Sequence, residues 1–222
     1  AALFNAIKIV DKPLDGLKVV VTGVGAAGLA TTNLMLTSGV KNILGLDRQG
    51  ILHRGRDYGD NDAKQWFAES TNPDNLKGGI AEAMSGADLF IGLSAPGVIT
   101  LDHVKLMNRD PIVFAMSNPD PEIWPEEVSG HVRVMATGRS DYPNQVNNAL
   151  CFPGLFRGVL DTQSSEINDD MKLAAARAIA DGVPREHLSE EYIIPSLFDK
   201  SVVPRIAEAV SEASRRSGIS RV

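Results

Sequence analysis

The 222-residue sequence has a single cysteine, 5% aromatic residues and no apolar run of membrane-spanning length. Cys151 has no second cysteine for an internal disulfide, which is typical of a protein from a reducing cytosol. The apolar runs stay below the roughly 18 residues that a transmembrane helix needs, and no basic-then-apolar leader opens the chain. We therefore expect a cytoplasmic protein that does not interact with a membrane.

Positive charge is also in short supply. The chain has 22 basic and 28 acidic residues, which gives a formal net charge of −6. Binding to a nucleic-acid backbone needs a basic face, so a nucleic-acid partner is not expected. The histidines show no metal-ligand spacing, and they stand at His53, His103, His131 and His187. We predict no metal ligands and no catalytic acid–base pair within these residues.

The chain shows no linker, internal repeat or low-complexity tract, which favours one compact domain over residues 1–222. It starts with Ala1 rather than methionine, and Leu3, Ala6, Ile7 and Val10 already have helical spacing. A natural chain rarely starts inside an amphipathic helix. The sequence is therefore expected to be a fragment of a longer protein.

Short apolar segments alternate with helical patterns along most of the chain. Strands are predicted at residues 18–22, 42–47, 88–94, 112–117 and 132–137. Helices are predicted between them, ending near residue 37 and covering 61–70, 80–84 and 101–107, and the last third has helices at 144–159, 169–180 and around 203–213. This order predicts an α/β fold with a doubly wound parallel sheet, a Rossmann-like nucleotide-binding domain, and a helical C-terminal extension.

A glycine-rich turn follows the first predicted strand and opens a helix. Gly23, Gly25 and Gly28 have the GxGxxG spacing, and Asp47 ends the next strand, 19 positions beyond Gly28. In a dinucleotide site these glycines allow the tight turn, the approach of a pyrophosphate and close helix packing, while the acid binds the adenosine ribose. Asp47 favours NAD over NADP. A purely structural strand–turn–helix is the alternative.

Cations near Asp47 leave the cofactor preference open. Arg48 follows it directly, and Arg54, Arg56 and Lys64 lie a short distance downstream, so any of them could pair with the 2′-phosphate of NADP. Ordinary surface cations would look the same in the sequence.

Polar residues also follow three later strands, where ligands of open α/β sheets bind. Ser94 ends the strand at 88–94, and Asn118 directly follows the strand at 112–117. Both are candidates for the nicotinamide side. Asn118 precedes a proline, so a simple turn is its alternative explanation. Asn147 and Asn148, at the start of the predicted helix that holds Cys151, are candidates to bind a carboxylate. Cys151 itself lies in an apolar setting that favours a buried thiol.

Several segments together resemble the NAD(P)-binding domain of malic enzymes of the shorter bacterial type. They are Gly-Val-Gly-Ala-Ala-Gly at 23–28, Leu-Asp at 46–47 with Gly-Arg at 55–56, Ser-Asn-Pro at 117–119, and Pro-Asn-Gln-Val-Asn-Asn at 143–148 followed by Phe-Pro-Gly at 152–154. The resemblance runs from the first helix to the last. It implies oxidative decarboxylation of (S)-malate to pyruvate and CO2 with reduction of NAD(P)+, and a requirement for Mn2+ or Mg2+.

Residue roles follow from the resemblance. The pyrophosphate is expected at Gly23, Gly25, Ala26, Ala27 and Gly28, although many relatives have an acidic residue within this loop. Asp47 is expected at the adenosine ribose, and Arg56 matches a family arginine near the adenosine end. Asn118 and Asn148 are expected to contact the nicotinamide side and the malate.

The family's catalytic tyrosine and lysine and its three carboxylate metal ligands belong to segments upstream of Ala1, so this chain alone is expected to be inactive. The full-length protein is expected to form a homo-oligomer. Two alternatives stay open. One is a related amino-acid-dehydrogenase-like domain that acts on glutamate or a folate, and the other is a non-catalytic module that senses dinucleotides.

Overall fold

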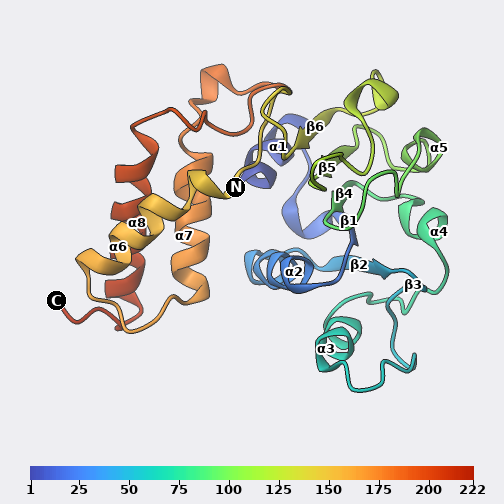
Figure 1. Cartoon of the computed structure of the whole chain (residues 1–222), viewed down its shortest axis with the longest axis horizontal. Helices are drawn as coiled ribbons and strands as arrows, with labels where there is room; N and C mark the ends of the chain where they lie inside the picture. Colours follow the sequence, from blue (N-terminus) through green and yellow to red (C-terminus); the bar gives the residue numbers. More distant parts are fainter. The chain divides into compact units, whose positions relative to one another are not determined.

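The computed structural model describes residues 1–222 and divides into two compact units. The sheet unit comprises Val10–Tyr142, and the helical unit comprises Ala1–Ile9 together with Pro143–Val222 (Figure 1). This division concerns packing alone, so a single domain over residues 1–222 stays a prediction. None of the helices is long and apolar enough to cross a bilayer.

Six strands form the sheet in the order β3-β2-β1-β4-β5-β6. They are β1 (Lys18–Thr22), β2 (Asn42–Asp47), β3 (Gly50–Ile51), β4 (Leu89–Gly92), β5 (Ile112–Ala115) and β6 (Val134–Thr137). All neighbouring pairs are parallel except β2 and β3, which are antiparallel. This order confirms the predicted doubly wound α/β fold, and the two-residue edge strand β3 is the one strand that the sequence pattern did not predict.

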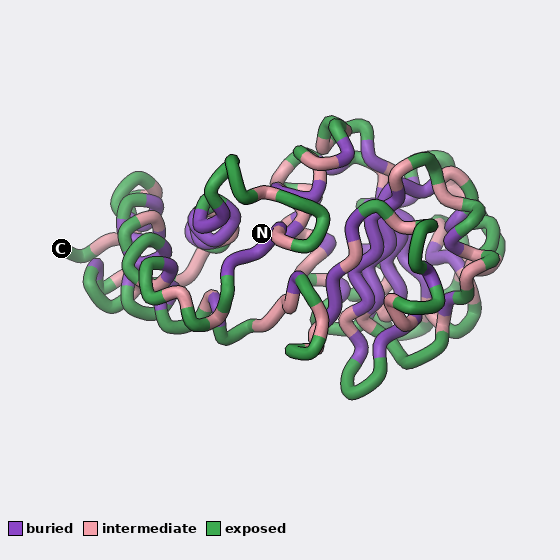
Figure 2. Tube along the Cα trace, turned by 90° about the horizontal axis from the view of Figure 1, so that it is seen from above, coloured by how far each residue is buried: buried purple, intermediate pink, exposed green.

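The strands are apolar because both faces of the sheet are covered. On one face, Val20, Phe90 and Val113 pack in a common core with Met84 of α4 (Ile80–Met84) and Val104 of α5 (Leu101–Val104). Figure 2 shows the strands as a continuous buried set. Continuous burial of this kind explains the lack of polar alternation in the sequence.

The opposite face carries α2 (Ala26–Ser38) and α3 (Asp62–Ser70). Gly45 of β2 leaves room for Phe67 of α3, because a Cβ at residue 45 would lie 2.2 Å from the ring atom Cε1 of Phe67. The helix predicted at 61–70 begins one residue later, since the side chain of Asn61 caps it by accepting a hydrogen bond from the Lys64 N–H at 3.0 Å.

The helical unit contains α6 (Phe152–Asp161), α7 (Asp169–Ala180) and α8 (Val202–Arg216), with most of α1 (Ala2–Val10). Two glycines bring α6 very close to α8. A Cβ at Gly154 would lie 2.5 Å from Cβ of Ile206, and one at Gly158 would lie 2.6 Å from the Ala207 carbonyl oxygen. In α1, the buried Asn5 side chain donates to the Ala180 and Ile193 carbonyls at 2.8 and 2.9 Å.

The helix predicted at 144–159 starts too early. Asn144 has φ = 58°, which a helix does not allow, and its buried side chain donates to the Glu190 carbonyl and accepts from the Ile193 N–H. A short 3-10 turn, η3 (Asn148–Leu150), comes next, and α6 begins only at Phe152. The long-range hydrogen bonds of Asn144 therefore override the local helical pattern.

Candidate cofactor-binding site

The order of the strands places a topological switch point at the carboxyl end of β1. The neighbours of β1 are β2 on one side and β4 on the other, so successive connections diverge at this point. Open α/β sheets bind ligands at such a topological switch point. The glycine loop that follows β1 lies here, and so does the exit of β4.

Two glycines of the loop are required by close contacts with neighbouring backbone. Gly23 has φ = 85°, and a Cβ there would lie 2.3 Å from the Leu93 carbonyl oxygen at the end of β4. A Cβ at Gly28 would lie 2.2 Å from the Gly23 carbonyl oxygen. The tight turn and the close helix packing that the sequence predicted for these two residues are both present.

Gly25 differs from its neighbours in the loop because it borders open space. No atom lies within 4 Å of the Cβ position there, and Ala26 and Ala27 are exposed. Gly25 is also the N-cap of α2 and offers no capping side chain. The first N–H groups of a helix have no acceptor within the helix and attract anions. The loop therefore has room and donors for a phosphate group.

Asp47, at the end of β2, is the centre of a charged cluster. Its Oδ2 accepts from Arg56 Nη2 at 2.6 Å and from Lys64 Nζ at 2.7 Å, and its Oδ1 accepts from the Gln49 N–H at 2.9 Å. Partial burial acts to raise the pKa of Asp47, but the hydrogen bonds from Arg56, Lys64 and Gln49 outweigh it and hold the pKa below its ordinary value. Asp47 is thus held as a carboxylate.

The four cations expected near the adenosine end separate into two groups. Arg56 and Lys64 bind Asp47, and Arg56 also lies over the Tyr58 ring at 5.0 Å, with its Nη1 buried and without a hydrogen-bond partner. Arg54 instead donates to the Pro73 carbonyl at 3.0 Å, and Arg48 is exposed. Only two of the four therefore adjoin the predicted ribose acceptor.

Ser94 lies beside the glycine loop, at the exit of β4. Its hydroxyl donates to Thr22 Oγ1 at the end of β1, at 3.1 Å, and its backbone nitrogen would lie 2.9 Å from a Cβ at Gly23. The structure therefore brings this predicted residue together with the loop.

Asn118 and Asn148 are both exposed, but they belong to different units. Asn118 follows β5 in the sheet unit, joined to Pro119 by a cis peptide bond, and its amide nitrogen would lie 3.3 Å from a Cβ at Gly138. In the helical unit, Asn147 caps η3 by accepting from the Ala149 N–H at 2.9 Å. Capping thus accounts for Asn147. It does not account for its neighbour Asn148, whose side chain is exposed.

Sequence reasoning missed Glu122. The residue is completely buried, and its carboxylate accepts one hydrogen bond from the Ser94 N–H and another from the Ser117 N–H, each at 3.0 Å. It thereby joins the exits of β4 and β5. Its neighbours Pro121 and Ile123 are buried as well, but nothing in the local sequence pattern indicated this.

The remaining candidates have structural explanations. Cys151 is half-buried, and burial raises the pKa of its thiol, which disfavours a reactive thiolate. Glu127 accepts a hydrogen bond from the Trp124 N–H at 2.9 Å and so caps a 3-10 turn. The structure contains no group of three or more histidine, cysteine, aspartate or glutamate side chains that could hold a metal ion.

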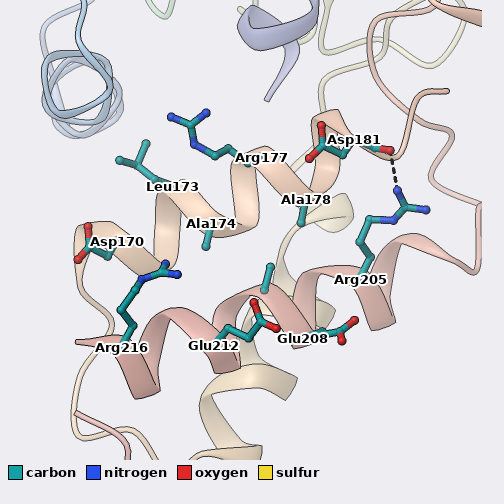
Figure 3. A pocket seen from close by; sticks show the side chains of 11 residues that line it. Asp170, Leu173, Ala174, Arg177, Ala178, Asp181, Arg205, Glu208, Glu212 and Arg216 are labelled. Atoms are coloured by element: carbon teal, nitrogen blue, oxygen red, sulfur yellow. Dashed lines mark hydrogen bonds between the residues drawn. The ribbon is translucent and has the colours of Figure 1, made fainter. Parts of the chain in front are cut away.

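A groove of about 640 Å³ lies between α7 and α8 in the helical unit (Figure 3). Ala174 and Ala178 stand on its α7 side, and charges of both signs surround it, including Arg216 and Glu212 of α8. Arg205 donates across one end to the Asp181 carbonyl at 2.6 Å. None of the predicted site residues lines this groove, so the candidate site is the carboxyl edge of the sheet.

The whole chain matches known proteins of one kind. A family model described as malic enzyme, NAD binding domain, matches residues 1–215. An NAD-dependent malic enzyme of Geobacillus stearothermophilus is 58% identical over 221 residues, which are all of this chain and 46% of that protein. An NADP-dependent malic enzyme of Halomonas elongata is 42% identical and is covered to 56%.

Solved structures show the same likeness. The crystal structure of malic enzyme from Pyrococcus horikoshii Ot3 superposes with a TM-score of 0.92 at 42% identity, and the match covers all of this chain and 53% of that one. The Entamoeba histolytica malic enzyme gives a TM-score of 0.94 at 36% identity, with 47% of its chain covered. The chain thus spans about half the length of these four relatives.

Proposed function

Because this chain belongs to the malic enzyme NAD-binding domain family, we propose that its glycine loop and the carboxyl ends of β1, β2, β4 and β5 hold NAD+ for the oxidative decarboxylation of (S)-malate to pyruvate and CO2. The observation that carries the proposal is the open space at Gly25, which adjoins the free start of α2 at the switch point of the sheet. A pyrophosphate needs this combination of room and N–H donors.

The cofactor would extend from the loop in two directions. The adenosine ribose would bind at Asp47, whose two oxygens have about four acceptor positions, of which three are in use. The nicotinamide would lie toward Ser94 and Asn118. Bound NAD+ supplies the hydride acceptor, and the residues of this chain hold and orient it.

We propose NAD+ as the preferred cofactor. The carboxylate of Asp47 would accept a hydrogen bond from a ribose hydroxyl, whereas its negative charge opposes the 2′-phosphate of NADP+. Arg56 and Lys64 would favour that phosphate if they were free, but both are engaged with Asp47. Direct titration with NAD+ and NADP+ measures this preference.

Malate and the divalent metal ion need groups beyond the cofactor site. Asn118 and Asn148 are the proposed contacts to malate, since an amide can both donate to a carboxylate and accept from a hydroxyl. The described residues do not fit a Mn2+ or Mg2+ site, because no suitable cluster of ligands lies together. We therefore assign no metal-dependent step to this chain, and the metal ligands and proton-transfer groups are proposed to lie in the half of the relatives that the chain does not match. The protein of that full length would be a cytoplasmic homo-oligomer.

Calorimetric titration tests the proposal. The chain is expected to bind NAD+ and, in an assay with malate, NAD+ and Mn2+, to give no turnover above the blank. Absence of NAD+ binding would remove the cofactor assignment, and clear turnover would show that the catalytic groups are within these residues. A dinucleotide sensor without catalysis is the competing function, and it is disfavoured if malate tightens NAD+ binding in a protein that contains both halves.

A further inference from the structure

Glu122 is a buried carboxylate that binds only backbone. Its side chain is fully inaccessible, and each of its two oxygens accepts one main-chain N–H, from Ser94 and from Ser117. No lysine, arginine or histidine forms an ion pair with it. Burying a carboxylate is costly unless hydrogen bonds compensate, so its burial depends on these two N–H groups. The two bonds join the segments that directly follow β4 and β5, because Ser94 and Ser117 each lie two residues beyond the end of their strand.

The sheet is shaped to accept this carboxylate. A Cβ at Gly92 in β4 would lie 2.2 Å from the carboxyl carbon of Glu122, so only glycine leaves enough space for it. The main chain on either side of Glu122 also contacts the turn after β4, since the Pro121 carbonyl accepts from the Gly97 N–H at 3.4 Å. The turn after β4 and the turn after β5 are therefore fixed to each other.

Arg139 fixes the same region from the other side. Its Nη1 donates to the Pro119 carbonyl at 3.0 Å, while its Nε and Nη2 bind the two oxygens of Asp141 at 2.8 and 2.7 Å. The guanidinium also lies 5.1 Å from the Trp124 ring. Both chain neighbours of Asn118 are therefore fixed by hydrogen bonds: Ser117 is bonded to Glu122, and Pro119 is bonded to Arg139.

We propose that Glu122 is a positioning residue for the nicotinamide half of the cofactor, because it sets the spacing between Ser94 and Asn118. This inference rests on the proposed function. The Glu122 carboxylate bonds neither the glycine loop nor Asp47. Its replacement should therefore weaken binding of the nicotinamide half and leave binding of the adenosine half unchanged. A residue that only stabilised the fold would affect both halves alike.

A comparison of two ligands tests this. ADP-ribose contains the adenosine, the pyrophosphate and a ribose but lacks the nicotinamide. In the Glu122→Gln variant, an amide N–H2 group faces one of the two N–H donors, and one hydrogen bond to a charged group is lost. The bond lies within the protein, so its free energy is an upper bound on the loss of binding: the Kd for NAD+ is expected to rise by up to about tenfold, while the Kd for ADP-ribose stays within about twofold of wild type. Asp120→Asn, the same change at an exposed site in the same turn, is the control and should leave both values unchanged.

Equal losses for both ligands, or an unchanged Kd for NAD+, would overturn the inference. Thermal unfolding shows whether Glu122→Gln folds. If it does not, Arg139→Lys gives the answer, since lysine keeps the charge but lacks the planar fork that binds both Asp141 oxygens and the Pro119 carbonyl at once. The expected result is again a loss confined to NAD+, and parallel losses or none would contradict it. A wild-type chain that binds neither ligand would refute the proposed function instead.

Discussion

Replacing Asp47 with alanine should reverse the order of preference between NAD+ and NADP+. The wild-type carboxylate binds Arg56 at 2.6 Å and Lys64 at 2.7 Å, and all three side chains are largely buried from solvent. Removing it takes away the acceptor for the ribose hydroxyl. The same change releases two cations and leaves the Arg56 guanidinium, whose Nη1 already has no partner, in need of an anion.

The size of the change follows from the bonds involved. A hydrogen bond to a charged group contributes about 1.5–3 kcal/mol, so NAD+ should bind about ten times more weakly or worse. A new bond of the same kind between the 2′-phosphate and Arg56 or Lys64 should strengthen NADP+ binding by a similar factor. The ratio of the two dissociation constants should therefore change by about 3 kcal/mol or more, which is a hundredfold or more.

Titration calorimetry of wild type and Asp47→Ala with each nucleotide measures this ratio. Asp60→Asn serves as the control, because Asp60 is exposed in the same loop and its loss should change neither constant. A parallel loss of NAD+ and NADP+ affinity would mean that Asp47 only organises the loop. An unchanged NAD+ affinity would show that the ribose does not bind at Asp47.

Four further outcomes test the geometry. Gly25→Ala should leave the unfolding free energy within about 0.5 kcal/mol of wild type but weaken NAD+ binding. Gly28→Ala should lower the unfolding free energy, measured by urea denaturation, by about 1–3 kcal/mol, because the new Cβ would collide with the Gly23 carbonyl. Gly154→Ala should cost a similar amount in the same assay through contact with α8, and unchanged stability would contradict the close packing of α6. The pKa of Asp47 is lowered by folding, so its contribution to stability is present above the unfolded value of about 3.9 and disappears as the pH falls through the lower folded value. As the pH falls through that range, the difference in unfolding free energy between wild type and Asp47→Asn should shrink. A difference that grows as the pH falls would contradict a stabilising role for the ion pairs of Asp47.

The sequence pattern predicted elements where local and tertiary forces agree. The strands at 18–22 and 42–47 and the helices at 80–84 and 169–180 have the observed bounds, because apolar runs and helical periodicity there match what the fold buries. The strand predicted at 88–94 ends at Gly92, because the Ser94 N–H turns to Glu122. Strand β3 has only two residues and leaves no periodic pattern.

Contacts between distant residues were beyond the reach of the pattern. The glycine loop and Asp47 could be predicted because their spacing is local. Glu122 could not, since its partner Ser94 lies 28 residues away and an acid between Pro121 and Ile123 resembles an ordinary surface turn. The sequence placed Arg56 close to Asp47, but it could not show whether Arg56 pairs with that carboxylate or stays free for a phosphate.

The space that Gly92 leaves for Glu122 also restricts how the sequence can change over time. A side chain at position 92 would collide with the carboxylate, and a smaller residue at position 122 would leave two backbone donors and a void. Neither substitution is tolerable without the other, so the two sites should be inherited as a pair. In a collection of related sequences, glycine at 92 should accompany glutamate at 122, and lineages that lose one should have lost both.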